Sequence, residues 1–159
     1  MTDLHCHILP AIDDGAKNAK VSMELLRMQN DAGITDIVCT PHFNPDSQNL
    51  EDFIDKRYRS ARYLADHVFR SELPVRLKFG AEVRISPTIL DLDFLPLCFQ
   101  KTKVMLLEMP RTLRPQWDTN VIYQLTLGGV IPLIAHIERY PYVQKNPNIA
   151  LDWIEAGGF

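Results

Sequence analysis

The sequence lacks the features of a secreted or membrane-spanning protein. It contains three cysteines, Cys6, Cys39 and Cys98, which are far apart and form no CxxC pair. An odd number of scattered cysteines predicts reduced thiols rather than a disulfide framework. No run approaches the ~18 apolar residues of a spanning helix, and no basic segment followed by an apolar one precedes the first histidines. We therefore expect a cytoplasmic protein with no export signal and no membrane insertion.

The sequence also lacks a strong excess of charge of either sign. It has 17 Lys and Arg against 20 Asp and Glu, a net charge of -3. A protein that binds nucleic acid through its phosphates normally carries excess positive charge, so nucleic acid is not expected as a partner. With 159 residues, 46% of them hydrophobic, the chain can bury one core and is too short for two ordinary domains. We expect a single domain over residues 1–159.

Short apolar runs alternate with longer amphipathic ones, a pattern typical of βα units around a parallel sheet or barrel. The spacing of the apolar residues and the residue composition of each segment predict the following helices and strands. The strands are expected over 2–5, 34–40, 75–83, 103–109 and 130–135, and the helices over about 18–32, 49–70, 115–127 and 149–156.

Glycine separates a predicted helix from the next predicted strand at two places, Gly33 and Gly128-Gly129. Gly157-Gly158 follows the last predicted helix in the same way, so a further buried strand is expected to begin at about Phe159. The sequence thus predicts a barrel truncated after about five βα units, with its C-terminal part missing.

Potential metal ligands stand at the ends of the predicted strands. His5 and His7 are two residues apart on the first strand, where alternation directs both side chains to the same side. Each later strand also contains or ends near a potential ligand. These are His42, Glu82, Glu108 and His136. Because strand C-termini of a (βα) barrel meet at one end, we expect these side chains to converge on one cleft.

The order and spacing of these motifs resemble the PHP (polymerase and histidinol phosphatase) superfamily. The stretch HILPAIDDGAK together with HIERY is similar to its branch of tyrosine phosphatases from bacterial capsule and exopolysaccharide systems. The matching motifs cover nearly the whole chain. They are His5-Cys-His7, Asp13-Asp14-Gly15, Thr40-Pro-His42, Gly80-Ala-Glu82, Glu108 and His136-Ile-Glu-Arg139-Tyr140.

The resemblance implies a distorted, TIM-like (βα)7 barrel of the PHP type that holds up to three divalent metal ions. It assigns His5, His7 and Glu82 to the first ion. The second would be held by Glu82, Glu108 and His136, and the third by Asp14 and His42. Asp14 is chosen over its neighbour Asp13 only because the family pattern aligns there. The final Asp-x-His of the family has no counterpart in this chain.

Imidazole and carboxylate ligands without thiolate suit Mn, Fe or Zn, and the resemblance favours Mn. Such a site supports hydrolysis of a phosphate monoester by a metal-activated water. Arg139, three residues after His136, is a candidate to bind the phosphate through its guanidinium. An ion pair with Glu138 is an equally good interpretation of Arg139.

Other catalytic mechanisms fit the sequence less well. A cysteine-dependent tyrosine phosphatase needs an arginine six residues after the cysteine, and none of the three cysteines has one. Cys6, where the family commonly has Ser or Thr, is expected to point away from the metal side and to pack. Asp91-Leu-Asp93 faintly resembles the motif of aspartyl-phosphate enzymes, but an acidic loop is the preferred interpretation.

The leading hypothesis is a metal-dependent protein-tyrosine phosphatase that acts on the phosphorylated tail of a kinase in capsule or exopolysaccharide synthesis. The kinase and its role are implied by the resemblance alone. A small-molecule phosphatase, such as one for histidinol phosphate, would share the same metal chemistry. A third possibility is a catalytically inactive fragment or a regulatory binder of the kinase, since the last ligand motif of the family is missing.

Overall fold

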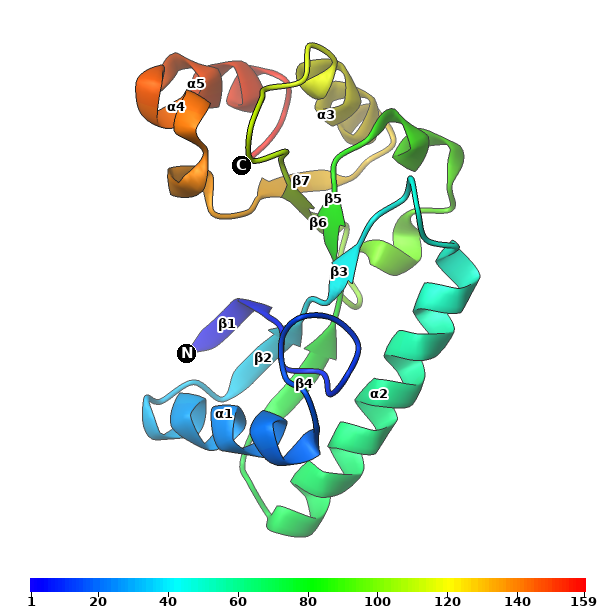
Figure 1. Cartoon of the computed structure of the whole chain (residues 1–159), viewed down its shortest axis with the longest axis vertical. Coiled ribbons are helices and arrows are strands. Elements are labelled where there is room, and N and C mark those ends of the chain that lie inside the picture. The colour runs from blue at the N-terminus through cyan, green and yellow to red at the C-terminus, as the bar shows by residue number, and fades with distance from the viewer.

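The structure is a computed structural model that describes all residues, 1–159, and its strands form two parallel sheets. The first sheet has the order β1-β2-β4, with β1 at Thr2–Cys6, β2 at Asp36–Cys39 and β4 at Arg76–Phe79. The second has the order β3-β5-β6-β7, with β3 at His42–Phe43, β5 at Glu82–Arg84, β6 at Val104–Glu108 and β7 at Ile131–Ile134. Figure 1 shows the first sheet below the second.

The two sheets are one series of strands with a break in its middle. The segment predicted as a single strand over 75–83 is interrupted at Gly80-Ala81, so that it forms β4 and β5. Backbone bonds cross the break, since Gly80 N–H donates to Cys39 O at 3.0 Å and Glu82 N–H to Pro41 O at 3.0 Å. The strands therefore follow one another in the order of the chain, as consecutive βα units do.

The interruption at Gly80 has a steric and a polar cause. A Cβ at this position would lie 2.7 Å from the ring of Phe99, so only glycine fits without a shift. The Gly80 carbonyl accepts a bond of 2.7 Å from the guanidinium of Arg57 on helix α2. The single-strand prediction was wrong here because these contacts come from residues far away in the sequence.

Helices α1 (Ala19–Asp31) and α2 (Leu50–Ser71) cover one face of the first sheet (Figure 1). Both begin as predicted, after Asn18 and Asn49, whose side chains accept a backbone N–H three residues later. Their buried residues pack against strand β2 in a common apolar cluster. It includes Met23, Leu26, Ile37, Cys39, Ala61, Leu64 and Val68.

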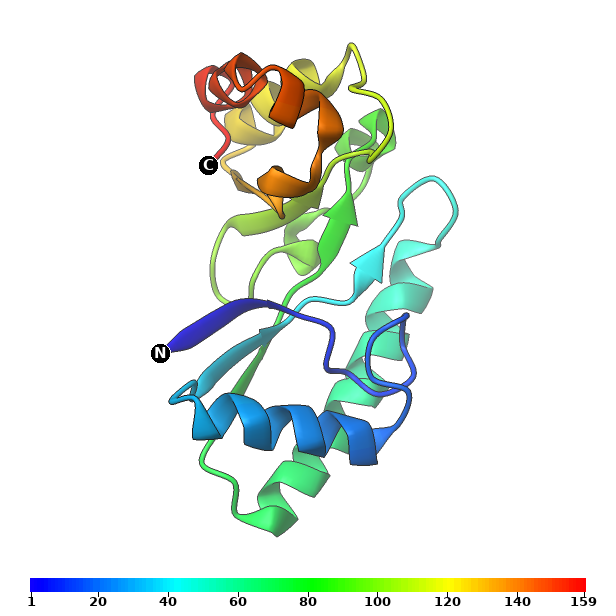
Figure 2. The same ribbon diagram turned by 60° about the vertical axis from the view of Figure 1, so that its left-hand side comes forward.

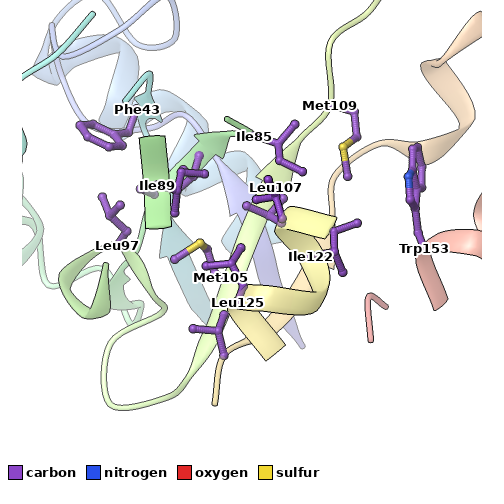
Figure 3. Close-up of a cluster of buried hydrophobic side chains, with 14 of the residues drawn as sticks. Phe43, Ile85, Ile89, Leu97, Met105, Leu107, Met109, Ile122, Leu125 and Trp153 are labelled. Carbon is purple, nitrogen blue, oxygen red and sulfur yellow. The ribbon is translucent and has the colours of Figure 1, made fainter. Parts of the chain in front are cut away.

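Helices α3 (Asp118–Leu127), α4 (Pro141–Lys145) and α5 (Asn148–Glu155) belong to the layer around β5, β6 and β7. The largest core cluster lies there, and Figure 3 shows part of it, including Phe43 and Trp153. Three 3-10 turns complete the structure at Pro87–Asp91, Leu95–Leu97 and Ile137–Arg139. Helix α3 begins three residues later than Pro115, where it was predicted, and the sequence analysis did not anticipate α4.

The last residue extends the sheet beyond β7. The N–H of Phe159 donates to Pro132 O at 2.8 Å, and its carbonyl accepts from Ile134 N–H at 2.7 Å. A strand was expected at this point, directly after Gly157-Gly158, and the backbone of Phe159 pairs as such a strand would. Both chain ends lie on the same side of the molecule in Figure 2. None of the helices combines the length and the apolar character that a membrane span requires.

Candidate metal centre

The predicted ligands come together at or beside the first or last residues of the strands. His5 lies on β1 and His7 just after it, His42 begins β3, Glu82 begins β5, Glu108 ends β6 and His136 follows β7. All of them except Glu108, together with Asp14, line a pocket of about 410 Å³ that contains no hydrophobic residue. His42 Nδ1 and Glu108 Oε2 are 4.0 Å apart, so the expected convergence on one cleft is observed.

Glu82 is the centre of the cluster. Its side chain is 1% exposed, and its Oε2 lies 3.1 Å from His5 Nε2 and 2.9 Å from His7 Nε2. His42 Nδ1 is 3.1 Å from the same oxygen. The other oxygen, Oε1, faces His136 Nε2 at 2.8 Å. One carboxylate thus joins four imidazoles from three other strands.

These contacts have the geometry of ligands that share a cation. Oε2 of Glu82 is buried without a hydrogen bond although three imidazole nitrogens surround it. The Nε2 atoms of His5 and His7 are 3.1 Å apart, and two metal bonds of about 2.1 Å at roughly a right angle require such a spacing. The residues present therefore fit a metal ion of the imidazole and carboxylate class.

More than one ion can be accommodated by the same residues. Three groups of side chains have ligand atoms within 4.8 Å of one another: His5, His7 and Glu82; His7, Asp14 and His42; and His42, Glu82 and Glu108. Glu108 also approaches His136 Nε2 at 3.8 Å. The side chain of Asp14 is 83% exposed and lies 3.4 Å from His42 Nε2, which makes it the outermost member.

Asp13 makes different contacts from its neighbour Asp14. Its Oδ2 accepts bonds from His7 Nδ1 at 2.7 Å and from the backbone N–H of His42 at 3.1 Å. Its Oδ1 accepts from Gly15 N–H at 3.0 Å. A carboxylate that holds the far nitrogen of a histidine fixes the ring and its tautomer for metal binding. The sequence analysis considered Asp13 only as a rival ligand and missed this orienting role.

Contacts within the cluster shift the pKa values of Glu82 and His7. Burial opposes the charged form of Glu82, but the imidazoles of His5 and His7 outweigh it and hold the pKa of Glu82 well below its usual range. Burial likewise opposes the charged form of His7, but its contacts with Asp13 and Glu82 raise its pKa to about 10. A proton therefore competes with a metal ion for His7.

Cys6 takes no part in the cluster, as expected. It packs against the apolar cluster beneath α1, and its Sγ accepts a bond from Gln29 Nε2 at 3.3 Å. Burial, with the nearby charge of Asp3, raises the pKa of the Cys6 thiol to about 11. A thiol that stays protonated at neutral pH is a poor nucleophile, which agrees with the absence of a cysteine-phosphatase motif.

Two arginines border the pocket. Arg139 was expected there, and its Nε also lies 3.5 Å from Glu138 Oε1. Its side chain is 65% exposed, so most of it stays accessible to solvent beside this ion pair. Arg111, which follows β6, was not identified from the sequence. Its position three residues after Glu108 was the available signal.

Residues 1–158 match the sequence model of a family described as "Capsular polysaccharide synthesis, CpsB/CapC". The chain belongs to the CpsB/CapC family. It is 34% identical to the tyrosine-protein phosphatase YwqE of Bacillus subtilis, in an alignment that covers 99% of this chain and 62% of YwqE. It is 29% identical to the putative tyrosine-protein phosphatase CapC of Staphylococcus aureus, covering 99% of this chain and 62% of CapC.

The fold is also that of a solved CpsB/CapC structure. The chain superimposes with a TM-score of 0.88 and 34% identity on one chain from the structures described as "Crystal structures of YwqE from Bacillus subtilis and CpsB from Streptococcus pneumoniae, unique metal-dependent tyrosine phosphatases". The match covers 99% of this chain and 64% of the solved one. The resemblance recognised in the sequence is confirmed, and so is a mixed α/β fold with parallel sheets. The chain spans less than two thirds of the length of these relatives.

Proposed function

We propose that this chain carries the metal centre of a phosphatase that hydrolyses phosphotyrosine on a kinase of capsule or exopolysaccharide synthesis. The observation that carries the proposal is the buried Glu82, with one oxygen facing His5, His7 and His42 and the other facing His136. Membership in the CpsB/CapC family and the names of its relatives, tyrosine-protein phosphatases, support the substrate class.

The proposed ligand sets follow the geometry of the cluster. His5, His7 and Glu82 would hold a first ion, and Glu82, Glu108 and His136 a second. His42 and Asp14 would hold a third at the exposed side. Mn suits this mixture of imidazole and carboxylate, and Fe or Zn would suit it also. When bound, the ions supply a hydroxide at neutral pH and neutralise charge that develops on the phosphate.

The residues of the chain have separate tasks in this reaction. Asp13 fixes the orientation of His7 through the bond to Nδ1. Arg139, at the pocket wall, binds phosphate oxygens through its guanidinium. Glu82 keeps the surrounding imidazoles at fixed spacing, because each of its oxygens contacts a different set. No side chain is needed as a nucleophile, and the high pKa of Cys6 excludes its thiol from that role.

We also propose that the five βα units are part of a distorted (βα)7 barrel of the PHP type, as a single domain. The consecutive parallel order of the strands supports this arrangement, as do the ligands at strand ends. The backbone bonds of Phe159 with Pro132 and Ile134 support a further parallel strand at the outer edge of β7.

The test compares substrates and metals in one assay. We expect the chain loaded with Mn²⁺ to release phosphate from a phosphotyrosine peptide faster than from a phosphoserine peptide or histidinol phosphate. A chelator should abolish this release. A longer variant, in which the last strands of a family member follow Phe159, should be the more active one, because the final ligand motif is then present. Preference for histidinol phosphate would overturn the proposed substrate.

A matched pair of variants tests the site itself. His136→Ala removes an imidazole that lies 2.8 Å from Glu82 and should reduce both metal content and turnover. His67→Ala removes a histidine of α2 whose Nδ1 contacts only the carbonyl of Tyr63, four residues earlier, and should change neither. Equal activity of the two variants would contradict the proposed metal centre.

A further inference from the structure

Arg111 is the one charged residue at the wall of the metal pocket to which neither the sequence nor the proposed function gives a role. The pocket is lined by the candidate ligands other than Glu108, by Gly15, and by two cations, Arg111 and Arg139. Arg111 lies in the segment between β6 and α3, residues 109–117, which is yellow-green in Figure 1. A second guanidinium at a polar pocket favours an anion with several oxygens that can accept bonds from both arginines.

Glu108 is the ion-pair partner of Arg111, but the contact between them is too long to be a normal hydrogen bond. The Nη2 atom of Arg111 lies 3.7 Å from Glu108 Oε1, and the Arg111 side chain is 67% exposed. Glu108 is also a candidate metal ligand. If Glu108 bound a metal ion, its negative charge would be neutralised by that ion. Arg111 would then lie close to the metal ions with no negative charge beside it to offset the repulsion. An anion with several oxygens, held between the metal ions and the guanidinium, removes that repulsion.

The segment that carries Arg111 is fixed at its beginning. The carbonyl of Pro110 accepts a bond of 2.9 Å from the hydroxyl of Tyr142. The neighbouring Met109 N–H donates to the hydroxyl of Tyr140 at 2.9 Å. Tyr140 is fully buried, so the backbone immediately before Arg111 is attached to the core.

The end of the segment is fixed by a buried carboxylate. Asp118, 1% exposed, accepts bonds from Arg114 Nε at 2.7 Å and from the indole N–H of Trp153 at 2.7 Å. Arg114 also reaches Asp152 at 2.6 Å. Arg111 therefore projects from a short segment with both ends anchored. Because the backbone is held in this way, only the exposed side chain of Arg111 has to be ordered when it binds a ligand.

We propose that Arg111 binds the phosphoryl group of the substrate, as a second phosphate-binding cation beside Arg139. This inference rests on the proposed function and adds a residue that makes substrate contact. Inorganic phosphate, the product of the reaction, carries the same recognised group and can be used as a probe. Arg111 would act by charge and by its fork of N–H donors, so lysine should replace it only in part.

The test measures binding of inorganic phosphate to the Mn²⁺-loaded chain by calorimetry, together with the metal content of each variant. Arg111→Gln should weaken phosphate binding by about tenfold, the effect of losing one charge-assisted contact, with metal content unchanged. Arg111→Lys should recover part of the loss. Arg59→Gln is the matched control, because Arg59 is 72% exposed and lies 3.8 Å from Asp55, outside the pocket.

Each outcome separates this inference from the proposed function. If the unchanged chain hydrolyses phosphotyrosine while Arg111→Gln and Arg59→Gln bind phosphate equally well, the inference is overturned and the proposed function stands. If Arg111→Gln weakens phosphate binding but the unchanged chain hydrolyses nothing, the proposed function fails alone. Arg111→Gln could instead weaken binding of an acidic phosphotyrosine peptide while binding free phosphotyrosine and phosphate normally. This result would mean that Arg111 contacts the peptide and not the phosphoryl group, and it would overturn the inference. Absence of phosphate binding by the unchanged chain would overturn it as well.

Discussion

Replacement of Glu82 by glutamine tests the metal centre most directly. Gln has nearly the same volume as Glu, so the buried site keeps its packing while Oε2 loses its charge. That oxygen lies within 3.1 Å of three imidazole nitrogens, on His5, His7 and His42. Loss of a residue that only orients a ligand lowers metal affinity by about 10- to 100-fold. Loss of a carboxylate that contacts the cation directly should lower metal affinity by at least about 100-fold.

The loss of metal affinity can be measured by thermal unfolding. At a metal concentration about 100 times the Kd, binding stabilises the native chain by about 2.7 kcal/mol, and a 100-fold weaker site at the same concentration gives only about 0.4 kcal/mol. For a chain of this size, each kcal/mol shifts the Tm by about 2–4 °C. The rise in Tm on addition of Mn²⁺ should therefore be about 5–9 °C smaller in Glu82→Gln than in the unchanged chain.

The comparison needs two controls. Each variant is first melted without metal, which separates any effect on packing from the effect on binding. Glu51→Gln makes the same chemical change at an exposed position in the first turn of α2 and should leave the metal-dependent rise intact. If Glu82→Gln shows the full rise, Glu82 is not a metal ligand and the proposed centre is wrong.

Three further variants have distinct expected outcomes. Asp13→Asn should lower metal affinity by about 10- to 100-fold, because His7 loses the carboxylate that orients it; unchanged affinity in calorimetry would show that the contact is not used. Cys6→Ser should leave metal content and hydrolysis nearly unchanged, since the thiol pKa is about 11, and a variant without activity would indicate thiol chemistry. Arg76 holds the pKa of Asp36 at about 2, below its ordinary 3.8. The stability that this pair contributes is present above about pH 4 and is lost as the pH falls towards 2. The denaturation midpoints of Asp36→Asn and the unchanged chain should differ at pH 6 and converge near pH 2, and a constant difference would contradict the shift.

Local signals in the sequence were sufficient for much of the fold. Helices α1 and α2 begin after Asn18 and Asn49, which cap them through contacts three residues away. The order of the ligands was also readable, because His5 and His7 follow the period of a strand and the remaining ligands stand beside strands of recognisable composition. These features depend on near neighbours in the chain, and a sequence displays near neighbours directly.

Only the tertiary structure decided the features that depend on contacts between distant segments. The break at Gly80 depends on Phe99 and Arg57, which lie 19 and 23 residues away. The choice between Asp13 and Asp14 depends on the direction of each carboxylate, since Asp13 points at His7 Nδ1 and Asp14 at His42 Nε2. Spacing along the chain predicted which residues would meet. How each carboxylate is directed there follows from packing, which no local pattern records.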